Sequence, residues 1–331
     1  MLNFKRRQAA RRRREPAVPY MNALIVNLNL SVDKTALIPG FGTGRIFRIG
    51  GTITLPGGKG VNVARALRSL GLETPVAGFA SGYNGRWISA SLRSENFRTF
   101  IQSHSSGESR VCYTVVDAKG RTTDLNEEGP PVPAASQAAF LRKFAALAPR
   151  FRAAAVCGRT SAGLKKGFYS SLVKAGAARG CFTVFDTSGP ALAEAVGAGA
   201  DGVKINRFEF EELCGARFSS AEVFRFFRAK TARGLKTLIV TDASGPAYAA
   251  SPFGLWKVCP PRLPRVTSAV GAGDSFMAGF LFGFLNGFDF ERTLRLAAGA
   301  AASDCLSVGA GFISRAQALG YAARARVQKL G

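Results

Sequence analysis

Short apolar runs alternate with helix-like segments over the second half of the chain. From about residue 138 onward, stretches with helical spacing are separated by four apolar runs of strand length, at 154–158, 181–186, 202–206 and 237–241. Such alternation is typical of a parallel sheet that is covered by helices on both faces. The apolar run ALIVNLNL at 23–30 predicts one more buried strand ahead of them. The pattern therefore predicts an α/β fold.

Three segments of the first half instead mix polar and apolar residues in rough alternation. They lie at 41–55, 110–117 and 121–126, and the last two are separated by the turn Ala-Lys-Gly at 118–120. Alternation with a period of two predicts exposed antiparallel strands. We expect them to form a small β appendage.

A helix is predicted between these strands. The segment VNVARALRSLG at 61–71 has helical spacing and ends at Gly71, a residue that favours a helix C-terminus. The expected organisation is one α/β domain over 21–331, whose appendage comes from two separate insertions at about 34–56 and 108–126.

Composition narrows the class of protein. The chain has 331 residues and 47% hydrophobic content, enough for a large core. Arg, Lys, Asp or Gly interrupts every apolar segment before it reaches the roughly 18 residues of a membrane span, so we expect no membrane partner. The six cysteines are far apart and show no metal-ligand spacing, which favours a reducing compartment and a cytoplasmic location.

The chain is strongly basic, with a formal charge of +24. Residues 1–15 alone hold seven Lys or Arg and one Glu, and we expect residues 1–20 to form a disordered arm. A nucleic-acid or membrane-surface patch and an organellar transit segment remain alternatives for this tail. The remainder of the chain lacks zinc-finger spacing and an RNP-like aromatic strand, so nucleic-acid binding by that part is not favoured. A positive field suits an anionic substrate.

The stretch SAVGAGDSFMAGFLFGF at 268–284 is the strongest candidate for chemistry. A glycine turn that leads into a helix offers free amides and a positive dipole end to an anion. Gly271, Ala272 and Gly273 fit such a turn, and Asp274 then lies in the first helical turn, where it can accept a proton from a hydroxyl. The alternative is that Asp274 only compensates the helix dipole, which leaves the glycines unexplained. His104, the only histidine, lies in a loop-like polar segment, so carboxylates or lysines must do the acid and base work.

A second glycine segment, PGGKGVNVARAL at 56–67, does not have the spacing of a Walker A loop. Gly57 and Gly58 before Lys59 allow close backbone approach to a ligand, and Asn62 can bond hydroxyl groups. A simple turn with a helix cap is an equal alternative.

The segment VKINRFEFEEL at 203–213 predicts a strand that runs into an acidic helix start. Asn206 and Glu209 could hold a magnesium ion with its waters, and Lys204 could bind a phosphate. The same spacing is that of a capping box, which the residues taken alone favour.

Together these segments resemble the PfkB-type branch of the ribokinase superfamily, and within it the 1-phosphofructokinase and tagatose-6-phosphate kinase group. The similarity runs from about residue 22 to the end and is carried by NLNLSVDKT, GGKGVNVARALRSLG, SRVCYTVVDAKGRTTDLNEEGP, KINRFE and SAVGAGDSFMAGF. It implies a ribokinase-like three-layer α/β/α domain with a small β-sheet lid, and it allows a homodimer formed through that lid.

The resemblance also implies roles for individual residues. Asp274 would be the catalytic base. The anion hole would be formed by Gly271, Ala272 and Gly273. The sugar would be bound by Asp33, Gly57, Gly58, Lys59 and Asn62. Arg110 matches a lid arginine expected near the substrate phosphate, with Lys34 and Arg48 as weaker candidates. ATP would be bound by Lys204, Asn206, Thr241, Gly245, Gly271 and Gly273, and Mg²⁺ by Asn206 and Glu209.

The activity implied is ATP-dependent phosphorylation of a sugar phosphate, with fructose 1-phosphate as the favoured substrate. Tagatose 6-phosphate, fructose 6-phosphate or an unphosphorylated sugar are alternatives. A different class, a catalytically weak protein that binds a sugar phosphate or nucleic acid, also remains. The main departure from the family is TDASGPAYA at 241–249, where Pro246 replaces a glycine of the usual nucleotide loop. Two further departures, CGRTSAG at 157–163 and Ile205, remove no chemical group.

Overall fold

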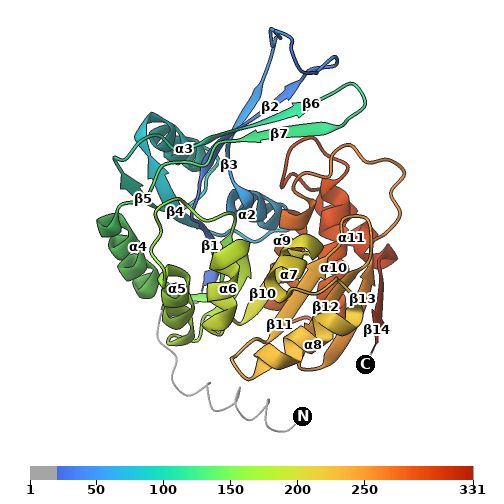
Figure 1. Ribbon diagram of the computed structural model, residues 1–331. Coiled ribbons are helices and arrows are strands. Elements are labelled where there is room, and N and C mark those ends of the chain that lie inside the picture. The colour runs from blue at the N-terminus through green and yellow to red at the C-terminus, as the bar shows by residue number, and fades with distance from the viewer. Residues whose placement is uncertain (1–20, 331) are drawn as a thin grey trace.

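The computed structural model describes residues 21–330, so the predicted arm at 1–20 lies outside the described residues. Within them, the core is a ten-stranded sheet in the order β14-β13-β12-β11-β10-β9-β8-β1-β4-β5 (Figure 1). Its strands are β1 (Met21–Asn27), β4 (Val76–Ser81), β5 (Thr99–His104), β8 (Phe151–Cys157), β9 (Phe182–Asp186), β10 (Gly202–Asn206), β11 (Thr237–Thr241), β12 (Ala247–Ser251), β13 (Gly254–Cys259) and β14 (Arg326–Lys329).

The sheet is mixed. Neighbouring strands run parallel from β5 to β11, whereas β12, β13 and β14 pair antiparallel at the other edge. The expected parallel sheet is therefore correct for the centre and wrong for this edge. The connections from β11 to β12 and from β12 to β13 are short, at 242–246 and 252–253, and connections this short join antiparallel strands, because a parallel pair needs a long crossover.

Helices cover both faces of this sheet. Alternate residues of β1 face opposite ways: Ala23 and Ile25 pack in one core cluster, and Leu24 and Val26 in another. The first face is covered by α2 (Lys59–Ser69), α3 (Gly82–Ser94), α9 (Ala272–Leu285), α10 (Phe290–Asp304) and α11 (Arg315–Arg324). The second is covered by α4 (Ala134–Leu147), α5 (Phe168–Ala177), α6 (Gly189–Gly197), α7 (Arg207–Cys214) and α8 (Ser220–Thr231). The predicted three-layer α/β/α architecture is confirmed, and a short 3-10 turn (Ala148–Arg150) precedes β8.

The helix α9 is held by close backbone contacts. A side chain at Gly279 of α9 would lie 2.6 Å from the carbonyl oxygen of Leu296 in α10, and one at Gly299 of α10 would lie 2.2 Å from the carbonyl of Ala318 in α11. Only glycine permits these approaches. This close packing of the three helices fixes the position of α9 and so of its N-terminus. In the described part of the chain, no helix combines the length and apolar character needed to cross a membrane.

A second sheet of four strands projects from the domain (Figure 1). Its order is β3 (Ile53–Gly57), β2 (Ser31–Leu37), β6 (Val111–Val116) and β7 (Thr122–Asn126). β2 pairs antiparallel with β3 and parallel with β6, and β6 and β7 are joined through the turn where Gly120 has a φ of 74°.

The strand expected over 41–55 was wrong in most of its length, because pairing with β2 begins only at Ile53 and residues 41–52 form no strand. Glycine disfavours strands because it has no side chain to pack and retains large conformational freedom. The segment is rich in it, at Gly42, Gly44, Gly50 and Gly51.

Candidate active site

The N-terminus of α9 presents free amides beside a carboxylate. Gly271 has a φ of 91°, and a side chain there would lie 2.6 Å from Cα of Ala310, so the turn requires glycine. Within the described residues, the backbone amides of Gly273 and Asp274 have no hydrogen-bond acceptor. Together with the helix dipole they give this turn the geometry expected of an anion-binding site.

Asp274 is buried next to that turn, with 6% of its surface exposed. Asn62 of α2 donates a hydrogen bond of 2.8 Å from Nδ2 to its Oδ2. Burial raises the pKa of Asp274 to about 6, although Lys59 and the Asn62 bond act in the opposite direction. The group is therefore ionised at neutral pH and has a pKa suited to a general base. Asn62, predicted to bind the sugar, contacts this carboxylate through its Nδ2.

A buried carboxylate joins two lysines below the same turn. Asp186 is fully buried at the end of β9, with Oδ1 3.1 Å from Nζ of Lys59 and Oδ2 2.8 Å from Nζ of Lys204. Burial alone raises the pKa of Asp186, but the two ammonium groups outweigh it and bring the pKa below its ordinary value. A side chain at Gly273 would lie 2.9 Å from Nζ of Lys204, so this ammonium lies directly against the anion-binding turn.

Sequence reasoning missed Asp186. A signal was present, because this carboxylate is the last residue of the apolar strand CFTVFD, at the carboxyl end of a parallel strand. Ligand sites of α/β sheets lie beyond these strand ends. The same signal marks Asn27, the last residue of β1, whose Oδ1 accepts a hydrogen bond of 2.7 Å from the amide of Gly60.

The structure brings the predicted sugar-binding residues of β2 and β3 together. Asp33 accepts hydrogen bonds from Oγ of Ser31 at 2.6 Å and from the amide of Gly58 at 3.3 Å. A side chain at Gly57 would lie 1.9 Å from Cγ of Asp33, so only glycine lets the carboxylate reach this turn. Lys59 is the next residue after Gly58, and its side chain reaches Asp186. Gly57 and Gly58 thus allow the Asp33 carboxylate to pack closely against the backbone of this turn.

Arg110 immediately precedes β6, whose residue Cys112 pairs in register with Asp33. Its Nε is 3.3 Å from the carbonyl oxygen of Asn29, and its Nη1 is 3.4 Å from that of Glu127. No carboxylate within the described residues forms an ion pair with it. Its charge is therefore available to an anion near Asp33.

The two weaker phosphate candidates fare differently. Lys34 lies on the face of β2 opposite to Asp33, because neighbouring strand residues point to opposite faces, and its Nζ is 5.4 Å from the centre of the Tyr113 ring. This geometry contradicts a role for Lys34 beside Asp33. Arg48 is exposed in the segment 38–52 and has no hydrogen bond or ion pair with the predicted site residues described here.

Asn206 and Glu209 form a complete capping box at the start of α7. Oδ1 of Asn206 accepts from the amide of Glu209 at 3.0 Å, and Oε2 of Glu209 accepts from the amide of Asn206 at 2.8 Å. The capping-box alternative is thus confirmed. Oε1 of Glu209 is 3.8 Å from Nζ of Lys59 and faces the cluster around Asp186.

The expected nucleotide loop follows β11. Thr241 pairs in register with Asn206 of β10, and its Oγ1 donates to the carbonyl of Ile205 at 3.3 Å. Beyond it, Ala243 has a φ of 40°, a left-handed conformation that costs most residues about 1–2 kcal/mol. The amide of Gly245 bonds the carbonyl of Asp242 at 2.5 Å, which closes the loop. The altered sequence therefore retains a tight turn at this strand end.

The pKa of Asp274 predicts the acid limb of the activity profile. The carboxylate must be ionised to accept a proton, so kcat/KM should fall about tenfold per pH unit below the pKa of about 6. Lys59 contributes no limb in this range, because Asp186 raises its pKa. The check is kcat/KM measured from pH 5 to 8.

Asp304 provides the control for this profile. It lies under the same turn, and burial raises its pKa to about 7. Asp304→Asn should keep the limb near pH 6, whereas the residual activity of Asp274→Asn should lack it. If the fall in kcat/KM below about pH 6 disappears in Asp304→Asn, or is absent from the wild type, Asp274 is not the group that titrates.

A buried carboxylate, free amides and a lysine that lie together suit the transfer of a phosphoryl group to a hydroxyl. The model of the pfkB family carbohydrate kinases matches residues 44–317. The chain belongs to the pfkB family of carbohydrate kinases.

Curated relatives and solved structures agree with this membership. The chain is 31% identical to a 1-phosphofructokinase of Rhodobacter capsulatus over 82% of its length and 86% of that protein. It is 29% identical to a 1-phosphofructokinase of Bacillus subtilis (82% and 88% covered) and 26% identical to a tagatose-6-phosphate kinase of Staphylococcus epidermidis (83% and 89% covered). Phosphofructokinase-2 from Escherichia coli in complex with potassium superimposes with a TM-score of 0.85 at 22% identity, covering 92% of this chain and 98% of that one. A ribokinase of Arabidopsis thaliana superimposes with a TM-score of 0.72 at 17% identity, covering 92% of this chain and 99% of that one, which confirms the ribokinase-like fold.

Proposed function

We propose that this kinase transfers the γ-phosphoryl group of ATP to a free hydroxyl of fructose 1-phosphate. The observation that carries the proposal is the buried Asp274, whose pKa is raised to about 6, beside the free amides of the glycine turn. The relatives named 1-phosphofructokinase support this choice of sugar. Arg110, close to Asp33 and without a carboxylate partner, supports a substrate that carries a phosphate.

The chemistry follows from the residues present. Asp274 takes the proton of the acceptor hydroxyl, whose oxygen forms a bond to the γ-phosphorus as the bond to the ADP oxygen breaks. Asn62 keeps the carboxylate oriented by its 2.8 Å hydrogen bond. The amides of Gly273 and Asp274, with the ammonium of Lys204 beside them, stabilise negative charge on the transferred group. The proton ends on Asp274 and the phosphoryl group on the sugar.

Magnesium fits the site in a limited way. No group of three or more His, Cys, Asp or Glu in the described part of the chain could enclose a metal ion. Mg²⁺ is usually bound by one or two carboxylates, with phosphates and waters as its other ligands. Oε1 of Glu209 lies outside the capping box and can serve in this way, while Oδ1 of Asn206 is engaged in the cap. When bound, the ion would neutralise phosphate charge.

Replacing Arg110 tests the proposed substrate. Arg110→Ala should lower kcat/KM for fructose 1-phosphate on the order of 100-fold, about 3 kcal/mol for a lost charge-assisted contact, and change little for fructose. Lys34→Ala is the matched control, because this cation lies in the same sheet on the opposite face from Asp33 and should leave both values near those of the wild type. Equal losses on both sugars would mean that Arg110 does not bind the phosphate.

A panel of sugars distinguishes the alternatives. ADP release should be fastest with fructose 1-phosphate, compared with tagatose 6-phosphate, fructose 6-phosphate and unphosphorylated ketohexoses. Tagatose 6-phosphate is the closest competitor, since one relative is named for that activity. Sugar-phosphate binding without ADP release would support the alternative of a catalytically weak binding protein.

We also propose a homodimer formed through the second sheet. Leu125 and Tyr113 pair across β6 and β7 on one face of this sheet, and they are 56% and 36% exposed. A second copy would cover them. A cytoplasmic location is inferred from the six cysteines, all of which are free thiols.

A further inference from the structure

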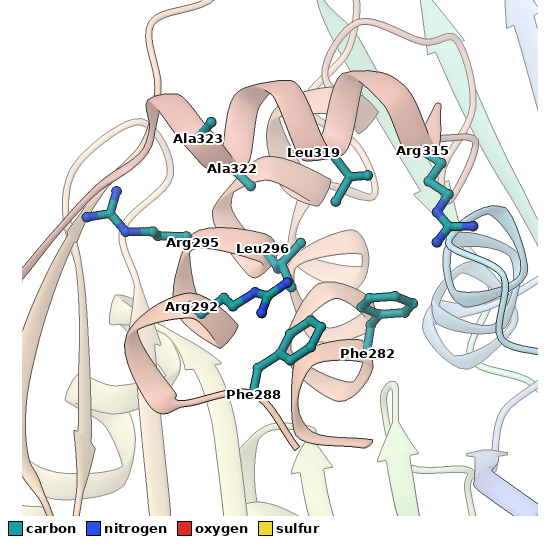
Figure 2. A pocket seen from close by; sticks show the side chains of 9 residues that line it. All are labelled: Phe282, Phe288, Arg292, Arg295, Leu296, Arg315, Leu319, Ala322 and Ala323. Carbon is teal, nitrogen blue, oxygen red and sulfur yellow. The ribbon is translucent and has the colours of Figure 1, made fainter. Parts of the chain in front are cut away.

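A cavity lies between α9, α10 and α11, away from the candidate active site. Its volume is about 390 Å³, within the range of about 300–1,000 Å³ that small-molecule sites occupy. Figure 2 shows an apolar floor between the three helices, formed by Phe282, Phe288, Leu296, Leu319 and Ala322. None of the residues assigned to the active site lines it.

Two arginines flank this floor. The guanidinium of Arg292 lies 3.6 Å from the centre of the Phe288 ring, and Arg315 projects from the start of α11 on the other side of Phe282 (Figure 2). Neither side chain has a carboxylate or hydrogen-bond partner in the described part of the chain. Both charges are therefore available to an anion.

A third arginine lines the same cavity but differs in its contacts. Arg295 pairs with Oε1 of Glu291, at 2.8 Å from Nη2 and 3.1 Å from Nε, and it donates to the carbonyl of Ala325. Figure 2 shows its guanidinium turned away from the phenylalanine rings. The cavity thus has two available cations and one that is already neutralised.

We propose that this cavity binds a small organic anion, one with an aromatic or short aliphatic body and a carboxylate or phosphate group. The body would lie on Phe282 and Phe288. The anionic group would be bound by Arg292, and Arg315 would turn in from the other side of Phe282 (Figure 2) to complete the pair, because guanidinium groups bind both kinds of anion in pairs of hydrogen bonds. The chain's own N-terminal segment does not fit this role, since residues 1–15 carry seven Lys or Arg. Phe282 lies eight residues after Asp274 on α9, about 12 Å along the helix, so the site is separate from the base.

The test uses 4-fluorophenyl phosphate as the probe and fluorine NMR of the full chain as the measurement. The probe should bind, and Arg292→Gln and Arg315→Gln should each weaken binding about tenfold or more, as expected for a lost charge-assisted hydrogen bond. Inorganic phosphate and neutral 4-fluorobenzyl alcohol should both bind more weakly than the probe.

Two control variants separate the proposal from its rivals. Arg295→Gln removes the same charge from the same wall and should leave probe affinity near that of the wild type, and so should Arg110→Ala in the active site. Loss of probe binding in Arg110→Ala would place the probe at the sugar site. A loss in Arg295→Gln equal to the losses in Arg292→Gln and Arg315→Gln would mean that the probe responds only to the overall positive charge of the protein. Either result, or no binding, overturns the proposal. A concentration-dependent dimer in sedimentation that Arg292→Gln abolishes would overturn it in favour of a second copy.

Discussion

Replacing Asp274 with Asn should lower kcat by at least about 100-fold, the smallest usual contribution of a general base. Asn keeps the shape of the side chain and can still pair with Asn62, but it cannot accept a proton. Substrate affinity should change little, because the base acts mainly in the transition state. Steady-state kinetics with ADP release as the signal measure both quantities.

The stability of this variant separates a catalytic role from a structural one. Burial raises the pKa of Asp274 above its value in the unfolded chain, so the ionised carboxylate destabilises the fold, and this cost is fully present above about pH 6. Asn removes that cost, and the variant should be at least as stable as the wild type at pH 7. Loss of activity together with loss of stability would favour a merely structural carboxylate.

Glu222 offers a matched control for the dipole interpretation. It is the third residue of α8, as Asp274 is of α9, and it lies far from the glycine turn in the sequence. Glu222→Gln also removes a first-turn carboxylate. It should leave kcat unchanged, and a comparable loss in both variants would return Asp274 to the dipole role.

Much of the fold could be predicted because its pattern is local. Buried parallel strands are short apolar runs, and β11 was predicted at its observed bounds, 237–241. The strands β12 and β13 escaped prediction, because the short connections that precede them contain no helix and so break the alternation of helices and strands. The segment 41–52 was wrongly predicted as a strand, because its alternation of polar and apolar residues was given more weight than its glycines, which disfavour strands.

The site was predictable where a glycine turn marks it and not where charges meet across the fold. Gly271 to Asp274 form one contiguous motif whose geometry is local. Asp186 lies 127 residues from Lys59 in the sequence, and no local pattern shows that the two meet. Asn206 and Glu209 show that a local pattern can fit two interpretations. Their three-residue spacing suited both a metal site and a helix capping box, and the structure contains the capping box.

Asp186→Asn should lower the free energy of unfolding by about 3–5 kcal/mol, the usual cost of removing one partner of a buried ion pair. Lys204 has only 6% of its side chain exposed, so its ammonium would remain buried without a carboxylate. Lys59, with 41% exposed, can still reach water and should contribute less to the loss. Urea unfolding of wild type and variant at pH 7 measures the difference.

A double variant separates the stability of this pair from its function. Asp186→Leu combined with Lys204→Met replaces two buried charges by apolar groups and should recover most of the lost stability, since such replacements are often neutral. Activity should stay low, because the ammonium against the glycine turn is absent. As a surface reference, Glu222→Gln breaks the exposed ion pair with Arg225 and should cost less than about 1 kcal/mol. An active double variant would show that Lys204 supports only the fold, and a stable Asp186→Asn would show that the cluster does not depend on its central carboxylate.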